Sequence, residues 1–157
     1  MKTIVASLIS VVVGAFLGAV LGHQPQVTTS AAQQFFSNYY RKVTQANQRT
    51  ALFREDLTTD FQTSPHGSWP SYNSFWQTEK TVVVNDLTSV SGNPLSFNLT
   101  LTYYPTHGGN INGPQQTIFS LVCNGSWPSL LARIPGIGCP VNHLQIQSAL
   151  NVTSSAP

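Results

Sequence analysis

Charged residues are scarce in this 157-residue chain, in which Asp, Glu, Lys and Arg together make up only 8%. An average soluble domain holds about 25%. Here Ser, Thr, Asn and Gln carry the polarity instead, as is typical of exported proteins. The net charge is +2, and the seven basic residues are scattered, with no basic stripe among aromatic residues. We therefore expect no nucleic-acid partner.

Motifs for catalysis and for metal binding are also missing. Of the five acidic residues, only Asp86 lies within a strand pattern. A bulge or strand-end position explains it better than a base with a strongly raised pKa. Glu79 beside Lys80 indicates a surface pair. The histidines lie beside Gly, Pro or Asn in turn-like segments, which gives a metal site little support. We predict no catalytic residue, no metal site and no cofactor.

The N-terminus holds the one long uncharged run. Residues 4–21 are eighteen residues without a charge. This run is longer than the apolar region of a signal peptide, which has about 7–15 residues. It is just long enough to span a bilayer, for which a helix needs about 17–25 residues. We expect residues 1–22 to be a single-pass membrane anchor with the globular part extracytoplasmic, because Lys2 is the only basic residue before Arg41. The alternative is cleavage near Gly22 and secretion.

Gly14, Gly18 and Gly22 recur every four residues within this segment. On a helix they form one smooth stripe, which allows a second helix to approach closely, so self-association through this stripe is a candidate interaction. The alternative is that glycine is simply common in membrane segments.

Cysteine is nearly absent, and its two copies are Cys123 and Cys139. In an oxidising compartment an isolated pair favours a disulfide. A catalytic thiol would need a neighbouring base, which neither cysteine has in the sequence. We predict a structural disulfide between them.

Helical signals fill the first half of the chain after a polar linker over residues 23–29. Ser30 with Gln33 forms a capping-box pattern, and it opens a helix with one aromatic face made of Phe35, Phe36, Tyr39, Tyr40 and Val43. A second helix is predicted over residues 48–61, and a short one begins at Pro70.

Strand signals follow from Lys80. A β-branched run begins at Thr81, and residues 97–103 alternate between apolar and polar side chains. Further strands are predicted over residues 116–123 and from Leu144, before a loose tail over residues 152–157. Helices followed by consecutive strands predict an α+β domain over residues 30–151, with helices packed on a curved antiparallel sheet.

Several segments in this order resemble a known superfamily. They are Phe35-Phe36-Ser37-Asn38-Tyr39-Tyr40, then Leu57-Thr58-Thr59-Asp60-Phe61, then Ser71-Tyr72-Asn73-Ser74-Phe75-Trp76 leading into Thr81-Val82-Val83-Val84, and finally Leu121-Val122-Cys123-Asn124-Gly125-Ser126-Trp127. The order is similar to the nuclear transport factor two-like superfamily, especially to extracytoplasmic bacterial versions that follow a membrane helix. The insertion over residues 127–139 departs from the usual direct run into the last strand.

The resemblance implies a cone-like domain with a cavity at its open end. Some members are isomerases, cyclases or dehydratases, and many only bind or scaffold. Tyr39, Tyr40, Tyr72 and Trp76 are candidate cavity-lining residues, although core packing explains them as well.

We expect a membrane-anchored, non-catalytic domain that binds an envelope protein or a small apolar ligand. The alternatives are a cavity enzyme of isomerase or dehydratase type, marked by a buried acid beside a Tyr or His in the cavity, and a subunit of a secretion or conjugation channel.

Overall fold

The structure is a computed structural model, and it describes residues 24–64, 67, 69–125 and 127–152. Helices and strands follow one another in an α+β order, which confirms the predicted fold class. The elements are α2 (Thr29–Val43), α3 (Ala46–Glu55), β1 (Leu57–Ser64), α4 (Trp69–Thr78), β2 (Glu79–Ser89), β3 (Ser96–Pro105), β4 (Asn112–Cys123), α5 (Ser129–Ala132), the 3-10 helix η1 (Val141–His143) and β5 (Leu144–Asn151).

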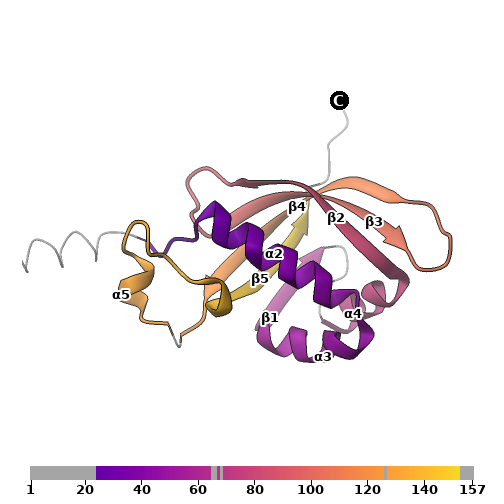
Figure 1. The fold of residues 1–157 in the computed structure, drawn as a ribbon, viewed down its shortest axis with the longest axis horizontal. Helices are drawn as coiled ribbons and strands as arrows, with labels where there is room; N and C mark the ends of the chain where they lie inside the picture. The colour runs from indigo at the N-terminus through magenta and orange to yellow at the C-terminus, as the bar shows by residue number, and fades with distance from the viewer. Residues whose placement is uncertain (1–23, 65–66, 68, 126, 153–157) are drawn as a thin grey trace, which may run out of the picture.

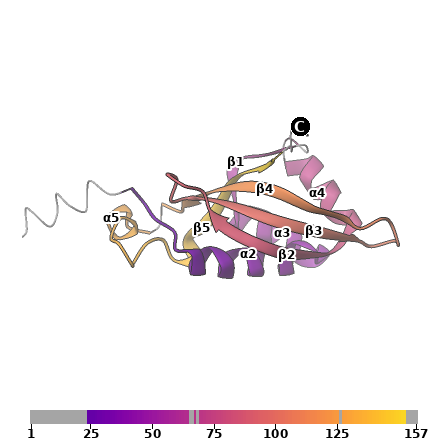
Figure 2. The same ribbon diagram turned by 90° about the horizontal axis from the view of Figure 1, so that it is seen from above.

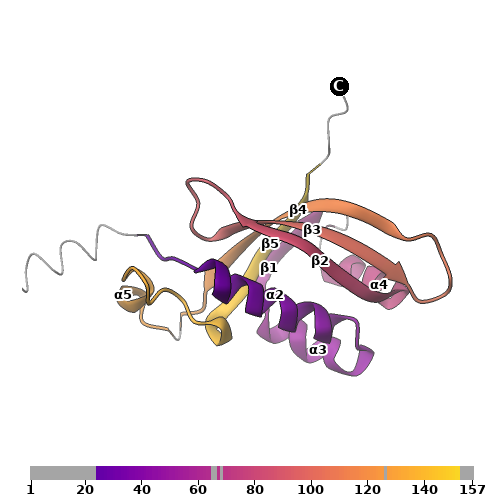
Figure 3. The same cartoon turned by 45° about the horizontal axis from the view of Figure 1, so that its top comes forward.

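Five strands form one curved sheet in the order β1-β5-β4-β3-β2. The pairs β2–β3, β3–β4 and β4–β5 are antiparallel, but β1 lies parallel to β5. The sheet is therefore mixed, and the prediction of a purely antiparallel sheet is wrong. In Figures 1 and 3 the helices α2 and α3 lie along one face of this sheet.

The predicted helix over residues 48–61 is wrong in its second half. Helix α3 ends at Glu55, and Leu57–Ser64 forms the edge strand β1. Phe53, Leu57 and Phe61 are four residues apart, and a spacing of four fits one face of a helix and one face of a strand equally well. The β-branched Thr58 and Thr59 between them favour the strand.

Helix α2 packs its aromatic face on the sheet as predicted. Its buried residues are Ala32, Phe35, Phe36, Tyr39, Tyr40 and Val43. The ring of Phe36 meets that of Phe119 on β4 edge to face, with centroids 4.9 Å apart. The helix begins two residues earlier than the capping-box pattern indicates, because Thr28 and not Ser30 is the N-cap, and the Thr28 hydroxyl accepts a hydrogen bond from Ala31 N at 3.1 Å.

The loop between β4 and β5 lies beside the start of the described chain, at the end of the molecule opposite the β3–β4 turn (Figures 1 and 2). The predicted disulfide is present, and Cys123 Sγ and Cys139 Sγ are joined across this loop. Such a bond indicates an oxidising, extracytoplasmic compartment.

The predicted anchor over residues 1–22, its stripe of Gly14, Gly18 and Gly22, and residues 153–157 of the predicted tail lie outside the described residues. Among the described residues, no helix has both the length and the apolar character needed to cross a membrane.

Candidate functional site

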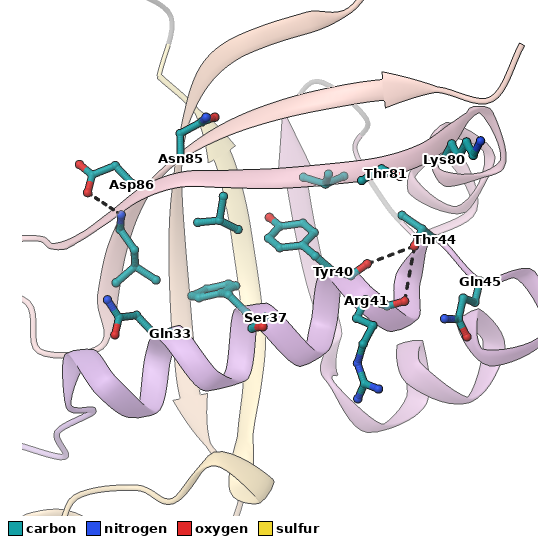
Figure 4. Close-up of a pocket in the computed structure, with 14 residues that line it drawn as sticks. Gln33, Ser37, Tyr40, Arg41, Thr44, Gln45, Lys80, Thr81, Asn85 and Asp86 are labelled. Atoms are coloured by element: carbon teal, nitrogen blue, oxygen red, sulfur yellow. Dashed lines mark hydrogen bonds between the residues drawn. The ribbon is translucent and has the colours of Figure 1, made fainter. Parts of the chain in front are cut away.

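A groove of about 730 Å³ runs between helix α2 and the edge strand β2. Cavities of about 300–1,000 Å³ are typical of small-molecule sites. Figure 4 shows the groove with the fourteen residues that line it. They are Gln33, Phe36, Ser37, Tyr40, Arg41, Thr44, Gln45, Lys80, Thr81, Val82, Val84, Asn85, Asp86 and Leu87.

The floor of the groove is apolar because α2 and β2 each turn apolar side chains toward it, at the spacing of a helix and of a strand. On α2, Phe36 and Tyr40 are four residues apart and so share the face turned to the sheet. On β2, Val82 and Val84 alternate inward, and Leu87 follows on the same side. The helix also provides a polar rim, because Gln33, Ser37 and Arg41 recur every four residues beside the aromatic face.

The hydroxyl of Tyr40 is the unusual polar group in this groove. The side chain is only 5% exposed, and its oxygen has no hydrogen-bond partner among the described residues. Burial raises the pKa of Tyr40 well above its ordinary value, so the hydroxyl keeps its proton. A buried hydroxyl without a partner costs about 1–3 kcal/mol. It can donate one hydrogen bond to a ligand and accept others.

The charged side chains of the groove lie at its rim. Asp86 sits at a bulge of β2, between Val84 and Leu87 in the register with β3, which confirms the bulge interpretation of this residue. Its Oδ1 accepts a hydrogen bond from Leu87 N at 2.9 Å. In Figure 4, Arg41 points away from β2, and its Nη2 donates to Asn38 Oδ1 at 3.5 Å. The groove therefore offers an apolar floor and a buried hydroxyl, without a charged group directed into its centre.

The four aromatic residues predicted to line a cavity lie together in one cluster. Tyr40 contacts Tyr39 with ring centroids 5.2 Å apart, and Trp76 with centroids 5.9 Å apart. Tyr72 meets Trp76 at 5.7 Å. Tyr40 lines the groove, and Tyr72 lines a second cavity. Tyr39 and Trp76 lie between them in the core and line neither one.

Two of these hydroxyls satisfy one another. Tyr39 Oη donates to Tyr72 Oη at 3.0 Å, and both side chains are buried. Burial raises the pKa of Tyr72 to about 12, although its hydrogen bond with Tyr39 acts in the opposite direction. Tyr39 and Tyr40 are thus adjacent on α2 but differ in kind, because one hydroxyl is paired within the core and the other is not.

The second cavity, of about 310 Å³, lies on the inner face of the sheet below α4. Tyr72 and Phe75 of α4 and Tyr103, Thr117 and Phe119 of the sheet contribute to its lining. Among the described residues that line it, there is no carboxylate and no imidazole. The polar atoms of this described lining come from hydroxyl and amide groups.

Glu79 is buried, not exposed, so the predicted surface pair with Lys80 is wrong. Neighbouring residues of a strand point to opposite faces, and here Glu79 is 9% exposed while Lys80 is exposed. Glu79 Oε2 has no hydrogen-bond partner among the described residues, and burial raises the pKa of this carboxyl. Glu79 lines neither the groove nor the second cavity.

Metal ligands do not gather in the part of the chain that the structure describes, where no group of three or more His, Cys, Asp or Glu side chains is placed to hold an ion. His143 packs against Trp127 with ring centroids 5.3 Å apart. His107 lies in the turn between β3 and β4, and His23 and His66 lie outside the described residues.

Sequence reasoning found the aromatic face of α2 but missed the polar rim beside it. The signal was present, because Gln33, Ser37 and Arg41 have the spacing of one helix face. The sequence did not indicate which strand lies next to this rim, because the position of β2 at the sheet edge beside α2 depends on the strand order. Comparisons with protein families, with characterised proteins and with solved structures found no match to this chain.

Proposed function

We propose that this protein is a non-catalytic, extracytoplasmic binding domain, held at the membrane by residues 1–22, that takes a small and mainly apolar ligand into the groove between α2 and β2. The observation that carries this proposal is the buried hydroxyl of Tyr40, which has no hydrogen-bond partner among the described residues although the side chain lines the groove. A ligand with one polar atom would satisfy that hydroxyl and cover the floor at the same time.

The disulfide and the uncharged run over residues 4–21 support the extracytoplasmic, anchored part of the proposal. Membership of the nuclear transport factor two-like superfamily remains part of the proposal as well. Its support is the order of the elements, two helices and a strand, then a further helix and four strands on a curved sheet.

Binding accounts for the site better than catalysis does. A general base must be able to reach the substrate with a pKa suited to the reaction. The acid in the groove, Asp86, is exposed at the bulge of β2, and its carboxylate already accepts a backbone hydrogen bond.

The hydroxyl can be tested with two probes of similar shape, 1-naphthol and 1-methylnaphthalene. We expect wild-type protein to bind 1-naphthol about fivefold to tenfold more tightly, because one hydrogen bond contributes about 1 kcal/mol. Tyr40→Phe should remove this preference and leave the affinity for 1-methylnaphthalene unchanged. Isothermal titration calorimetry gives both dissociation constants.

A second pair of variants locates the binding. Ser37→Trp narrows the groove and should weaken both probes at least tenfold, whereas Ser74→Trp changes an exposed serine on α4 that does not line the groove. Equal affinities in wild type and Ser37→Trp, or a naphthol preference that survives Tyr40→Phe, would contradict the proposed site.

The anchor has its own test, which is the intact mass of the protein recovered from its native membrane fraction. We expect the full-length mass, with no alkylation of cysteine until the disulfide is reduced. A mass that begins near His23 would contradict the anchor and leave a secreted domain.

A further inference from the structure

The loop between β4 and β5 has an unusual composition for a surface segment. Over residues 124–140 its one charged residue is Arg133, and its large apolar residues are Trp127, Leu130, Leu131, Ile134 and Ile137. The disulfide closes this segment, and α5 is its short helix. Apolar residues with a basic residue and a tryptophan are the composition of segments that lie in a membrane interface.

Two of these apolar side chains face solvent. Ile137 is 52% exposed and Leu130 is 38% exposed. Other parts of the same loop are buried, notably Ala132 and Cys139. The loop is therefore docked on the domain through part of its residues and leaves Leu130 and Ile137 exposed. Exposed large apolar residues grouped in one segment mark an interaction surface more often than residues scattered singly do.

The loop holds the chain at the point where it enters the domain. Gln26 N donates to Ala132 O at 3.0 Å, and Cys139 N donates to Gln26 O at 2.9 Å. The approach is so close that a Cβ at Gly138 would lie 2.9 Å from Gln26 O, and Gly138 has a φ of +59°. The position of Gln26 against the loop is thus fixed by hydrogen bonds on both of its backbone polar groups and by a glycine that leaves it room.

The distance from this contact to the predicted anchor is short. Four residues separate Gly22 from Gln26, and a fully extended chain spans at most about 3.6 Å for each residue. Gln26 therefore lies within about 14 Å of Gly22. If residues 1–22 cross a bilayer, the loop docked on Gln26 must lie close to the surface of that bilayer.

We propose that the disulfide-closed loop between β4 and β5 is a lipid-contacting surface, with Leu130 and Ile137 inserted at the boundary between headgroups and acyl chains. The inference rests on the anchor in the proposed function and goes beyond it by naming the second contact. Interfacial segments bury their apolar side about 5–10 Å into this boundary. Two contacts, the anchor and the loop, would fix the orientation of the domain and hold the groove between α2 and β2 in one position relative to the bilayer.

The test uses the full-length chain in vesicles of phosphatidylcholine and phosphatidylglycerol. Ile137→Trp places a fluorophore on the loop. Ile111→Trp is the matched control, because Ile111 is 61% exposed and belongs to the turn between β3 and β4, which lies at the opposite end of the domain (Figure 1). The measured quantity is the tryptophan fluorescence of each variant minus that of wild type, which is the excess emission. It is measured with and without brominated lipid, and again with acrylamide in the water phase. Flotation of each variant with the vesicles is measured on the same samples.

We expect every variant to float with the vesicles. The excess emission of Ile137→Trp should be mostly lost in brominated lipid and protected from acrylamide, whereas that of Ile111→Trp should show the reverse. Flotation without lipid quenching at position 137 would overturn the loop contact and leave the anchor intact. Failure to float would overturn the anchor, and this inference with it. Quenching by lipid at both positions would mean unspecific adsorption and overturn the inference. Protection from acrylamide at position 137 without lipid quenching would mean contact with a second copy of the chain, and would also overturn it.

Discussion

Removal of the disulfide should destabilise the domain by an amount that follows from the length of the loop it closes. Cys123 and Cys139 are 16 residues apart. In the chain-entropy model a closed loop of this length lowers the entropy of the unfolded chain by an amount worth about 3 kcal/mol at 25 °C. The double variant Cys123→Ala, Cys139→Ala loses this term. Because Cys139 is also 1% exposed, removal of its sulfur adds a packing loss of about 1 kcal/mol.

Loss of the crosslink should show in two measurements. Breaking the crosslink frees the loop, which also holds the linker through the two hydrogen bonds of Gln26. Local opening should therefore become easier, so that the backbone amides of Gln26 and Cys139 exchange faster with solvent than those of the central strands. The free energy of global unfolding should fall by the whole loss.

Urea denaturation and hydrogen exchange are the two measurements. We expect the free energy of unfolding to fall by about 3–4 kcal/mol in the double variant. Reduced wild-type protein, which keeps both sulfurs, should lose about 3 kcal/mol, and this control separates the crosslink from the packing. A difference below about 1 kcal/mol between oxidised and reduced wild type would refute the reasoning, because the loop would then be equally ordered without its bond.

Five further substitutions have outcomes set by burial and backbone geometry. Burial raises the pKa of Glu79, so its carboxyl binds a proton more tightly in the folded chain than in the unfolded chain. The free energy of unfolding must therefore fall as the pH rises from the unfolded pKa through the folded one. Glu79→Gln should lack this fall in urea titrations between pH 4 and pH 8, and it should be more stable than wild type at neutral pH. Gly138→Ala should lower the free energy of unfolding by about 1–3 kcal/mol and should speed amide exchange in the linker. Gly136 also has a positive φ, but nothing lies within 4 Å of its Cβ position. Gly136→Ala should therefore lower the free energy of unfolding by less and leave amide exchange in the linker unchanged. Tyr39→Phe should lower the thermal midpoint, because it removes the buried hydrogen bond from Tyr39 to the hydroxyl of Tyr72. Tyr40→Phe should raise the thermal midpoint in the absence of ligand, because it removes a buried hydroxyl that has no partner among the described residues, and the gain in stability should be about 1 kcal/mol. Equal effects of the two substitutions would contradict the different environments of the two side chains.

Local patterns in the sequence predicted the elements whose period is unambiguous. The buried face of α2 combines spacings of one, three and four residues, as in Phe35, Phe36 and Tyr39, which no strand shares, and residues 97–103 alternate in a way that no helix does. Leu57 and Phe61 fit both periods, and so the prediction failed there. The parallel pairing of β1 with β5 joins segments about 90 residues apart, and no local pattern contains it.

One of the four residues predicted to line a cavity lies in the groove, and the place of the groove was not predicted. Tyr40 was predicted to line a cavity, and the structure has it in the wall of the groove. The sequence did not predict that the groove lies beside the edge of the sheet, since this depends on the strand order. Glu79 was assigned to the surface because an acid beside Lys80 suggests an exposed pair. Neighbouring side chains of a strand point to opposite faces. Once the strand was recognised, this rule could have placed Glu79 and Lys80 on different faces.

Tyr39 and Tyr40 together give the strongest argument for a ligand. Both are buried tyrosines on one helix, and folding alone would favour a partner for each hydroxyl, because an unpartnered one costs about 1–3 kcal/mol. The structure provides that partner for Tyr39 in the hydroxyl of Tyr72, but the buried hydroxyl of Tyr40, a residue that lines the groove, has no partner among the described residues. Phenylalanine in place of Tyr40 would have kept the packing with Phe36 and Trp76. A side chain that lowers stability and faces a groove of ligand size is explained by what it binds there, since sites that serve function are where proteins depart from their most stable sequence.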